Sequence, residues 1–239
     1  MSTGICANRH LIKISGEALA GREPRGVDSV ALDDIGHELL AAAREDVEIA
    51  VVVGGGNFMR GGSSSLPMKR LTADYVGMLA TVMNGLYLEQ WLVHHGIDTE
   101  IFSAIPLDSQ IRRYSADAVV QCLHKRQVVV LAGGTGNPYF TTDTTAALRG
   151  LELGAASLIK ATNVDGIYDA DPATDANASR YRYIDYDTAM VKNLKIMDAA
   201  AFALCREHNL PIRVVNLGVK GNLQRAVKRE DIGTLVARG

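Results

Sequence analysis

The stretch VVLAGGTGNPYFTTDTTAALRG, residues 129–150, decides the fold of this 239-residue chain. It begins as an apolar run, passes through three glycines within four positions, and continues into a helical pattern that starts at Thr141, Thr142 and Asp143. An apolar run followed by a glycine turn and a helix is the repeating unit of α/β proteins. The glycines follow the carboxyl end of the predicted strand, which is where open α/β sheets bind ligands.

Short β-rich runs alternate with longer helical windows along the whole chain. The expected strands are mostly apolar, as in a parallel sheet covered on both faces, and lie at 10–15, 48–54, 98–104, 127–133, 157–162 and 212–217. The expected helices lie at about 29–45, 69–95, 115–125, 142–153, 197–208 and 221–229. The region 163–196 is predicted to be a polar, turn-rich loop with room for a hairpin.

These alternating elements predict an α/β fold, a three-layer αβα sandwich around a mostly parallel central sheet. No low-complexity linker or internal repeat divides the sequence. We therefore expect a single domain over 1–239, with an amino-terminal lobe to about 155 and a carboxy-terminal lobe from about 156.

Composition excludes several classes of protein. The chain has 25 basic and 27 acidic residues, so it lacks the basic excess that nucleic-acid binding requires. Its three cysteines, Cys6, Cys122 and Cys205, are too far apart for a disulfide framework or a metal knuckle. Neither an apolar run of the ~18 residues that span a membrane nor a signal-peptide pattern is present, so we expect a cytoplasmic protein.

Two further glycine loops follow predicted strands. VVVGGGNFMRG, residues 51–61, places three consecutive glycines after its apolar run, and LIKISGEAL, residues 11–19, ends its run with Lys13, Ser15 and Gly16. Glycine loops expose backbone N–H groups, and helix N-termini add partial positive charge, so each loop suits a phosphate group. A single loop of this kind would be an ordinary turn, but three at one edge of a sheet indicate a ligand with several phosphates.

Two lysines, Lys13 and Lys160, are expected near the ends of predicted strands. A lysine in an apolar strand must reach solvent or meet an anion, and the glycine loops beside both favour the anion. Fixed cations are what phosphoryl transfer needs, because its transition state is mostly charge to be stabilised. Asp143 is placed to orient a lysine, although a first-turn or capping role in the helix would also explain it.

Other signatures of catalysis are missing or ambiguous. The P-loop, the GxGxxG dinucleotide motif, the GxSxG nucleophile elbow and HExxH are all absent. Asp169 and Asp171 resemble a metal-binding DxD pair, but Asp-Ala-Asp-Pro is equally a turn sequence.

The segment VGMLATVMNGL, residues 76–86, is apolar nearly all the way round a helix. A helix of this kind is buried on every side, either in the core of one chain or at an interface between subunits. The two interpretations fit the sequence equally well.

In this order, these segments resemble the amino-acid-kinase fold family, and within it the bacterial UMP kinases. The similarity spans nearly the whole chain, from LIKISGEAL through IKATNVDGIYDADP to LKIMDAAAFALCREHNLPIRVVNL. It implies transfer of the γ-phosphoryl group of ATP to UMP, with Mg²⁺ accompanying ATP and no covalent intermediate, in pyrimidine nucleotide biosynthesis. It also implies a homohexamer built from dimers, with the UMP side in the amino-terminal lobe and the ATP side in the carboxy-terminal lobe.

The resemblance implies roles for individual residues. The catalytic residues would be Lys13, Lys160 and Asp143. The ATP-binding residues would be Lys13, Ile14, Ser15, Gly16, Gly56, Arg60, Thr162, Asn163, Tyr168 and Asp171. The UMP-binding residues would be Gly55, Asp74, Thr135, Gly136, Asn137, Pro138, Tyr139, Phe140, Thr141 and Thr142, with Asp74 holding the ribose. No residue is assigned as a metal ligand.

The sequence departs from the family at positions linked to regulation. Many bacterial members are activated by GTP and inhibited by UTP, and the usual pair in the segment GREPRGVD is replaced here by Pro24 and Arg25. Positions that are often basic in GTP-responsive members are here Glu89, Val93, Glu100 and Gln127. Carboxylates repel a triphosphate, so we expect weak or absent GTP activation, whereas UTP would still inhibit by occupying the UMP site.

Three alternative functions remain open at this stage. The same fold could serve another acceptor, such as N-acetylglutamate, aspartate, carbamate or an isoprenyl phosphate. A non-catalytic member that stores oxyanion clusters would bind nucleotide without turnover, although retention of both lysines argues against it. A gene-regulatory role would require a DNA-binding surface that the charge balance does not offer.

Overall fold

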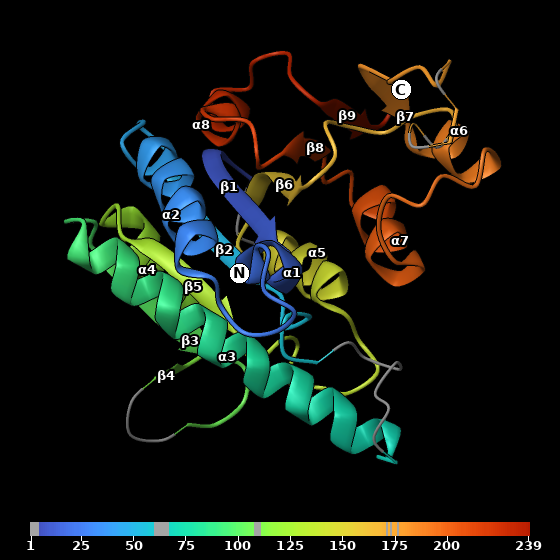
Figure 1. The fold of residues 1–239 in the computed structure, drawn as a ribbon. Helices are drawn as coiled ribbons and strands as arrows, with labels where there is room; N and C mark the ends of the chain where they lie inside the picture. Colours follow the sequence, from blue (N-terminus) through green and yellow to red (C-terminus); the bar gives the residue numbers. More distant parts are fainter. Residues whose placement is uncertain (1–4, 60–66, 108–110, 171, 173, 176) are drawn as a thin grey trace.

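A single nine-stranded sheet runs through the computed structural model, which describes residues 5–59, 67–107, 111–170, 172, 174–175 and 177–239 (Figure 1). The strand order is β4-β3-β5-β2-β1-β6-β8-β9-β7. The strands are β1 (Cys6–Ile14), β2 (Glu48–Val53), β3 (Thr99–Ser103), β4 (Arg112–Arg113), β5 (Val128–Ala132), β6 (Ala155–Thr162), β7 (Tyr183–Asp185), β8 (Ile212–Asn216) and β9 (Thr234–Ala237). Every described pair of neighbours is parallel except β8 and β9, which are antiparallel.

Helices cover both faces of this sheet. They are α1 (Gly16–Ala20), α2 (Ser29–Ala43), α3 (Arg70–His94), α4 (Ala116–His124), α5 (Thr142–Glu152), α6 (Tyr186–Val191), α7 (Ala199–Glu207) and α8 (Asn222–Val227). Side-chain oxygens of Asp28, Thr141, Asp185 and Asp198 accept backbone N–H bonds at the starts of α2, α5, α6 and α7. These caps satisfy N–H groups that a helix cannot pair internally, so they explain where these helices begin.

Two hydrophobic cores form because alternate strand residues point to opposite faces. In β1, Ile12 and Ile14 pack with α2 and α3 on one face, while Leu11 packs on the face that α5 covers. Lys13 follows Leu11 by two positions and therefore shares the α5 face. The predicted three-layer αβα sandwich with a mostly parallel sheet is confirmed.

All six predicted strands and all six predicted helices are present, with bounds shifted by a few residues. The largest shift is in β1, which begins at Cys6 because its first residue pairs with Ala155 of β6. The sequence prediction missed α1, β4, β7, α6 and β9. The division into two lobes remains a prediction.

The loop predicted at 163–196 is more ordered than its composition indicated. An antiparallel bridge joins Tyr168 to Arg180, so the hairpin is present, but β7 and α6 also fall in this region. The prediction of a loop for those residues is wrong because β7 takes its order from pairing with β9, about fifty residues later in the chain.

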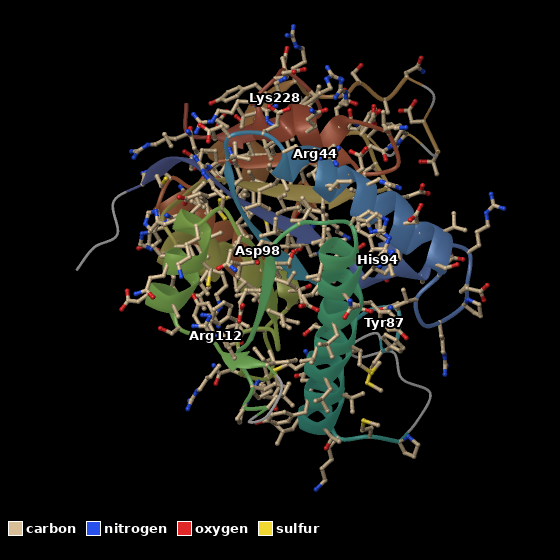
Figure 2. All side chains as sticks on the ribbon, turned by 90° about the vertical axis from the view of Figure 1, so that its left-hand side faces the viewer. Arg44, Tyr87, His94, Asp98, Arg112 and Lys228 are labelled. Carbon is tan, nitrogen blue, oxygen red and sulfur yellow. The ribbon has the colours of Figure 1, made fainter. Side chains whose placement is uncertain are left out.

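The long helix α3 presents two apolar faces. Its inner face, which includes Met78 and Leu88, is buried against the sheet. Its outer face exposes large apolar side chains, namely Leu71, Tyr75, Leu79, Met83, Leu86, Tyr87 and Val93. Figure 2 shows α3 along the front of the molecule, with Tyr87 and His94 labelled on it. Burial on all sides within one chain is therefore wrong for this helix, and the subunit-interface interpretation remains a prediction.

No helix in the described part of the chain combines the length and apolar character needed to cross a membrane.

Candidate active site

The two candidate lysines lie side by side on adjacent parallel strands. Lys13 of β1 and Lys160 of β6 are register partners in the sheet. Neighbouring residues in register point to the same face, so both side chains project toward α5. The sequence separates the two lysines by 147 positions, and the pairing of β1 with β6 brings them together.

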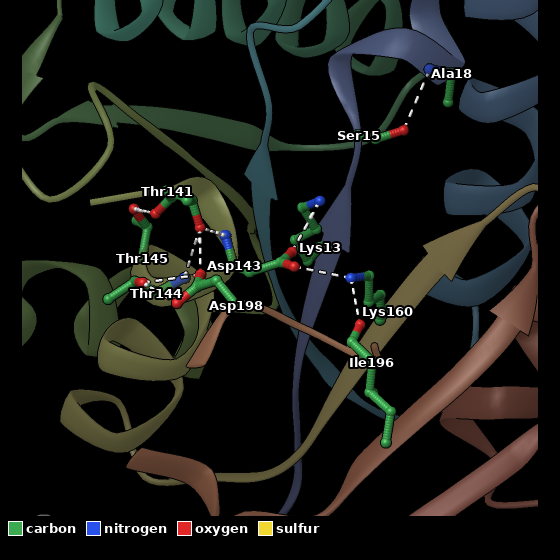
Figure 3. Close-up of polar contacts among 10 residues, drawn as sticks. All are labelled: Lys13, Ser15, Ala18, Thr141, Asp143, Thr144, Thr145, Lys160, Ile196 and Asp198. Atoms are coloured by element: carbon green, nitrogen blue, oxygen red, sulfur yellow. Dashed lines mark hydrogen bonds and ion pairs between the residues drawn. The ribbon is translucent and has the colours of Figure 1, made fainter. Parts of the chain in front are cut away.

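Asp143, in the first turn of α5, lies between the two ammonium groups (Figure 3). Its Oδ1 is 2.9 Å from Lys13 Nζ, and its Oδ2 accepts a 2.8 Å hydrogen bond from Lys160 Nζ. Lys160 Nζ also donates to the Ile196 carbonyl oxygen at 2.6 Å. All three side chains are largely buried, with exposures of 10% for Lys13, 14% for Asp143 and 19% for Lys160.

This cluster carries an excess of positive charge. Burial alone would raise the pKa of Asp143, but the neighbouring Lys13 and Lys160 outweigh it and hold that pKa below its ordinary value. The carboxylate is therefore ionised and balances only one of the two lysines. The remaining unit of positive charge suits an anion at the carboxyl ends of β1 and β6.

The start of α5 is held by a second carboxylate, which the sequence reasoning did not single out. Asp198 caps α7 and also accepts hydrogen bonds from the hydroxyls of Thr141 and Thr144. Thr141 in turn caps α5 by accepting from the backbone N–H of Asp143. In the sequence Asp198 is only an aspartate near the start of the helix predicted at 197–208, a commonplace position for an N-cap.

The loops after β1 and β2 approach each other backbone to backbone. A Cβ on Gly16 would lie 2.6 Å from the Gly56 nitrogen, and a Cβ on Gly54 would lie 2.7 Å from the Gly16 nitrogen. A Cβ on Gly55 would lie 2.6 Å from the Gly77 carbonyl oxygen in α3. No side chain fits at these positions, so the glycines are required for the two loops to pack beside α3.

A cavity of about 490 Å³ opens beside these loops. Seven predicted site residues line it, namely Gly55, Gly56, Asp74, Asn137, Phe140, Thr141 and Thr142. The sequence reasoning did not predict the other lining residues, which are Glu17, Met59, Arg70, Ala73, Gly77, Met78, Thr81 and Gly134. Thr135, Gly136, Pro138 and Tyr139 belong to the loop between β5 and α5 but do not line the cavity. The structure thus brings many of the residues predicted to bind UMP to one cavity, while their roles remain predictions.

One wall of this cavity is an ion pair on α3. Arg70 Nε donates to both oxygens of Asp74, at 2.8 and 2.9 Å. The backbone N–H of Tyr139 donates to Asp74 Oδ2 at 2.8 Å, and the Arg70 guanidinium lies over the Tyr139 ring. The Arg70 partner of Asp74 has no distinctive signal in the sequence, because an arginine at the start of a helix is unremarkable there.

The other predicted nucleotide-binding residues lie at the carboxyl ends of β1 and β6 or in the segments that follow them. Ile14 ends β1, Ser15 caps α1 by accepting from the Ala18 backbone N–H, and Thr162 ends β6. Asn163 is exposed just beyond β6, and the Tyr168 hydroxyl donates to Asp165 at 2.6 Å. Arg60 and Asp171 lie outside the described residues.

A larger cavity of about 650 Å³ lies between α6 and α7, and none of the predicted site residues lines it. It is lined by apolar side chains such as Tyr186 and Phe202 and rimmed by charged ones. It contains neither lysine of the cluster nor any of the glycine loops, so it does not belong to the candidate site.

No group of three or more His, Cys, Asp or Glu side chains in the described ranges is arranged to hold a metal ion. In the one carboxylate of the lysine cluster, Oδ2 accepts a hydrogen bond from Lys160, while the buried Oδ1 makes an ion pair with Lys13 but no hydrogen bond within the described part of the chain.

Comparison with known proteins agrees with this geometry. The profile of the "Amino acid kinase family" matches residues 8–216, which include both lysines and all three glycine loops. The chain belongs to the amino acid kinase family. Two solved structures of members are similar over nearly their whole length. The UMP kinase of Bacillus anthracis is 32% identical with a TM-score of 0.93, covering 96% of each chain. The UMP kinase of Ureaplasma parvum is 35% identical with a TM-score of 0.91, covering 98% of this chain and 100% of that one.

A more distant solved structure has the same fold. The uridylate kinase of Archaeoglobus fulgidus is 26% identical with a TM-score of 0.73, over 95% of this chain and 99% of that chain.

Proposed function

We propose that this chain is a UMP kinase, which transfers the γ-phosphoryl group of ATP to UMP and releases UDP and ADP. The observation that carries the proposal is the pair of buried, register-matched lysines that share one carboxylate beside a cavity. The similarity to two UMP kinases at TM-scores of 0.93 and 0.91 supports UMP as the acceptor.

The lysine cluster supplies what phosphoryl transfer demands. Negative charge is spread over the oxygens of the transferring group in the transition state, and preorganised cations stabilise it without reorganising. Lys13 and Lys160 are preorganised because Asp143 and the Ile196 carbonyl fix their ammonium groups. The transfer is in line, from ATP to the UMP phosphate oxygen, with no covalent intermediate on the protein.

No general base is required in this reaction. A phosphate monoester has a second pKa of about 6, so the attacking oxygen of UMP is already anionic at neutral pH. Asp143 is unsuited to proton abstraction, because the two lysines hold its pKa below the ordinary value. Its role is to position the lysines.

The donor is Mg·ATP, with the ion carried by the nucleotide. Mg²⁺ usually keeps several waters and binds through substrate phosphates with few protein carboxylates. The pairing of Asp143 with both lysines leaves that carboxylate unsuited to a metal ligand role.

The cavity beside α3 is the proposed UMP site. Asp74, Thr141 and Thr142 all line it, so a ribose and a phosphate would each meet suitable groups. A small amino-acid acceptor would leave much of the 490 Å³ unfilled.

The test is ADP release from Mg·ATP, measured separately with UMP, CMP, dUMP, aspartate and N-acetylglutamate as acceptors. We expect turnover to depend on UMP, with no activity on the two amino acids. Absence of UMP-dependent ADP from the folded protein would overturn the proposal and favour the nucleotide-storage alternative.

We also propose that the protein works in the cytoplasm, in pyrimidine nucleotide biosynthesis, as a homohexamer whose dimers pack through the outer face of α3. Seven large apolar side chains of α3 are exposed, and a single soluble chain would normally cover such a surface. Light scattering after size exclusion should give the hexamer mass for the native protein and a smaller species for Met83→Lys. A monomeric native protein would contradict this.

GTP activation is expected to be weak, and UTP would inhibit at the UMP site. The pKa of Glu89 is raised, first by burial and then by the nearby carboxylate of Glu100. The two acidic side chains therefore lie near each other, although Glu100 is also 3.4 Å from Arg112. A several-fold rise in rate with GTP at subsaturating ATP would refute the first expectation.

A further inference from the structure

Asp74 is held from two directions by groups that the proposed reaction does not yet use. Arg70 Nε contacts both of its oxygens, and the Tyr139 backbone N–H contacts Oδ2. One of these partners comes from α3 itself, four residues earlier in the helix, and the other from the loop between β5 and α5. The carboxylate is only 11% exposed, while Arg70 is 51% exposed.

These contacts leave a defined acceptor capacity on Asp74. An ionised carboxylate offers about four lone-pair directions, two on each oxygen. Among the described residues Oδ2 has two donors and Oδ1 has one. Oδ1 therefore keeps a lone pair for a further donor. Because Asp74 lines the cavity, a ligand there could supply that donor.

The contact to Asp74 from the loop comes from a residue in an unusual backbone conformation. Tyr139 adopts a φ of 72°, in the left-handed region that bulky residues rarely occupy, and this conformation accompanies the aim of its N–H at Asp74. The Arg70 guanidinium lies 5.6 Å from the centre of the Tyr139 ring, so the same arginine contacts both Asp74 and the residue whose N–H binds Asp74.

We infer that Arg70 is a positioning residue that orients Asp74 toward the ribose 2′-hydroxyl of the acceptor nucleotide and so sets the preference for a ribonucleotide over a deoxyribonucleotide. The inference rests on the proposed function, because it concerns the acceptor of that reaction. Arg70 acts through Asp74: without it, the carboxylate keeps only the Tyr139 N–H and is free to rotate. A rotated carboxylate loses its hydrogen bond to the 2′-hydroxyl, whereas contacts to the base and phosphate remain.

The experiment compares Arg70→Met with a matched control, Lys69→Met. Lys69 is exposed at the same end of α3, makes no side-chain cap bond and does not line the cavity. Affinities for UMP and dUMP are measured by calorimetry, and kcat and both KM values by ADP release. We expect Arg70→Met to weaken UMP about tenfold, because it removes the fixed orientation of a charged hydrogen-bond acceptor. The same variant should weaken the affinity for dUMP less, so the preference for UMP over dUMP becomes smaller. The KM for ATP and the kcat should stay within about threefold of the native values.

Two further variants separate positioning from a general structural role. Arg70→Lys keeps the charge but not the guanidinium that contacts both oxygens. Its preference for UMP over dUMP should therefore lie between those of the native protein and Arg70→Met. In an Asp74→Asn background, Arg70→Met should add little further loss, because the residue through which it acts is already altered. Lys69→Met should match the native protein throughout.

Several results would overturn the inference. Equal losses for UMP and dUMP would place Arg70 on the phosphate or in the fold alone, and full additivity with Asp74→Asn would exclude action through that carboxylate. A native protein without any preference between UMP and dUMP, or one that binds neither, would also overturn it. Native protein that binds UMP in the expected pattern without turnover would instead refute the proposed function and leave the inference standing.

Discussion

The two ends of strand β1 carry buried ionic groups of opposite design. At its start, Arg9 donates to Glu48 Oε2 at 2.6 Å and to the Leu153 carbonyl, so the pair is neutral and closed. At its end, Lys13 and Lys160 share only Asp143. Both clusters are largely buried, yet one is balanced in charge and the other carries an excess cation. The difference indicates that the first serves stability and the second is built for an anionic ligand.

The largest effect should come from removing the excess charge. Lys13→Met, and separately Lys160→Met, should each lower kcat by about 10²–10³-fold, because a preorganised charge facing the transferring phosphoryl group is lost. Stability should hardly change, since Asp143 keeps one lysine partner in either variant. ADP-release kinetics and thermal melting measure the two quantities on the same sample. If the loss of rate were explained by a loss of folded protein, the lysines would serve stability, as Arg9 does, and the proposed difference between the two ends of the strand would be wrong.

The balanced end should respond in the opposite way. Arg9→Met leaves the Glu48 carboxylate buried without its arginine and should cost about 3–5 kcal/mol of unfolding free energy. The kcat of the remaining folded enzyme should be unchanged. Urea denaturation measures the stability of the variant.

A weaker contact to the same carboxylate provides the control for that experiment. His124 lies 3.2 Å from Glu48 Oε1 but is 61% exposed. His124→Gln should therefore cost no more than about 1 kcal/mol. If Arg9→Met were equally mild, the assignment of a stabilising role to the closed pair would be wrong.

A further effect concerns pH and involves His10, in the middle of the strand. Burial, and secondarily the nearby Arg229, lower the pKa of His10 from 6.5 to about 4, and its Nδ1 lies 2.8 Å from Ser157 Oγ. The unfolded chain therefore takes up a proton first as the pH falls, so stability declines from pH 6.5 downward until the folded state is protonated near pH 4. Between pH 7 and pH 5 this residue should account for a loss of about 2 kcal/mol.

Urea midpoints at the two pH values measure this loss in the native protein and in His10→Gln. The variant should show a flatter dependence on pH. A variant as sensitive as the native protein would assign the effect to other groups.

Much of the architecture could be predicted because it depends on local pattern. Apolar runs, glycine turns and helix periodicity gave every central strand, and the glycines at strand ends marked the edge of the sheet that carries the site. The short elements β4 and β7 could not be predicted in this way, since two or three residues hold no periodicity and their order comes from distant partners.

The site was predictable as a set of residues but not as an arrangement. Lys13, Lys160 and Asp143 each had a local reason to be noticed, but their mutual distances depend on the register of β1 with β6. Arg70 and Asp198 had no such reason, because an arginine or aspartate at a helix start is commonplace. Their partners, Asp74 and the hydroxyls of Thr141 and Thr144, become visible only in three dimensions.

The pairing of β1 with β6 also has a consequence for folding. Lys13, Asp143 and Lys160 are far apart in sequence, so their cluster exists only in the folded chain. The excess positive charge is therefore a property of the folded state. A phosphate-bearing ligand that binds to it should stabilise the folded chain against unfolding.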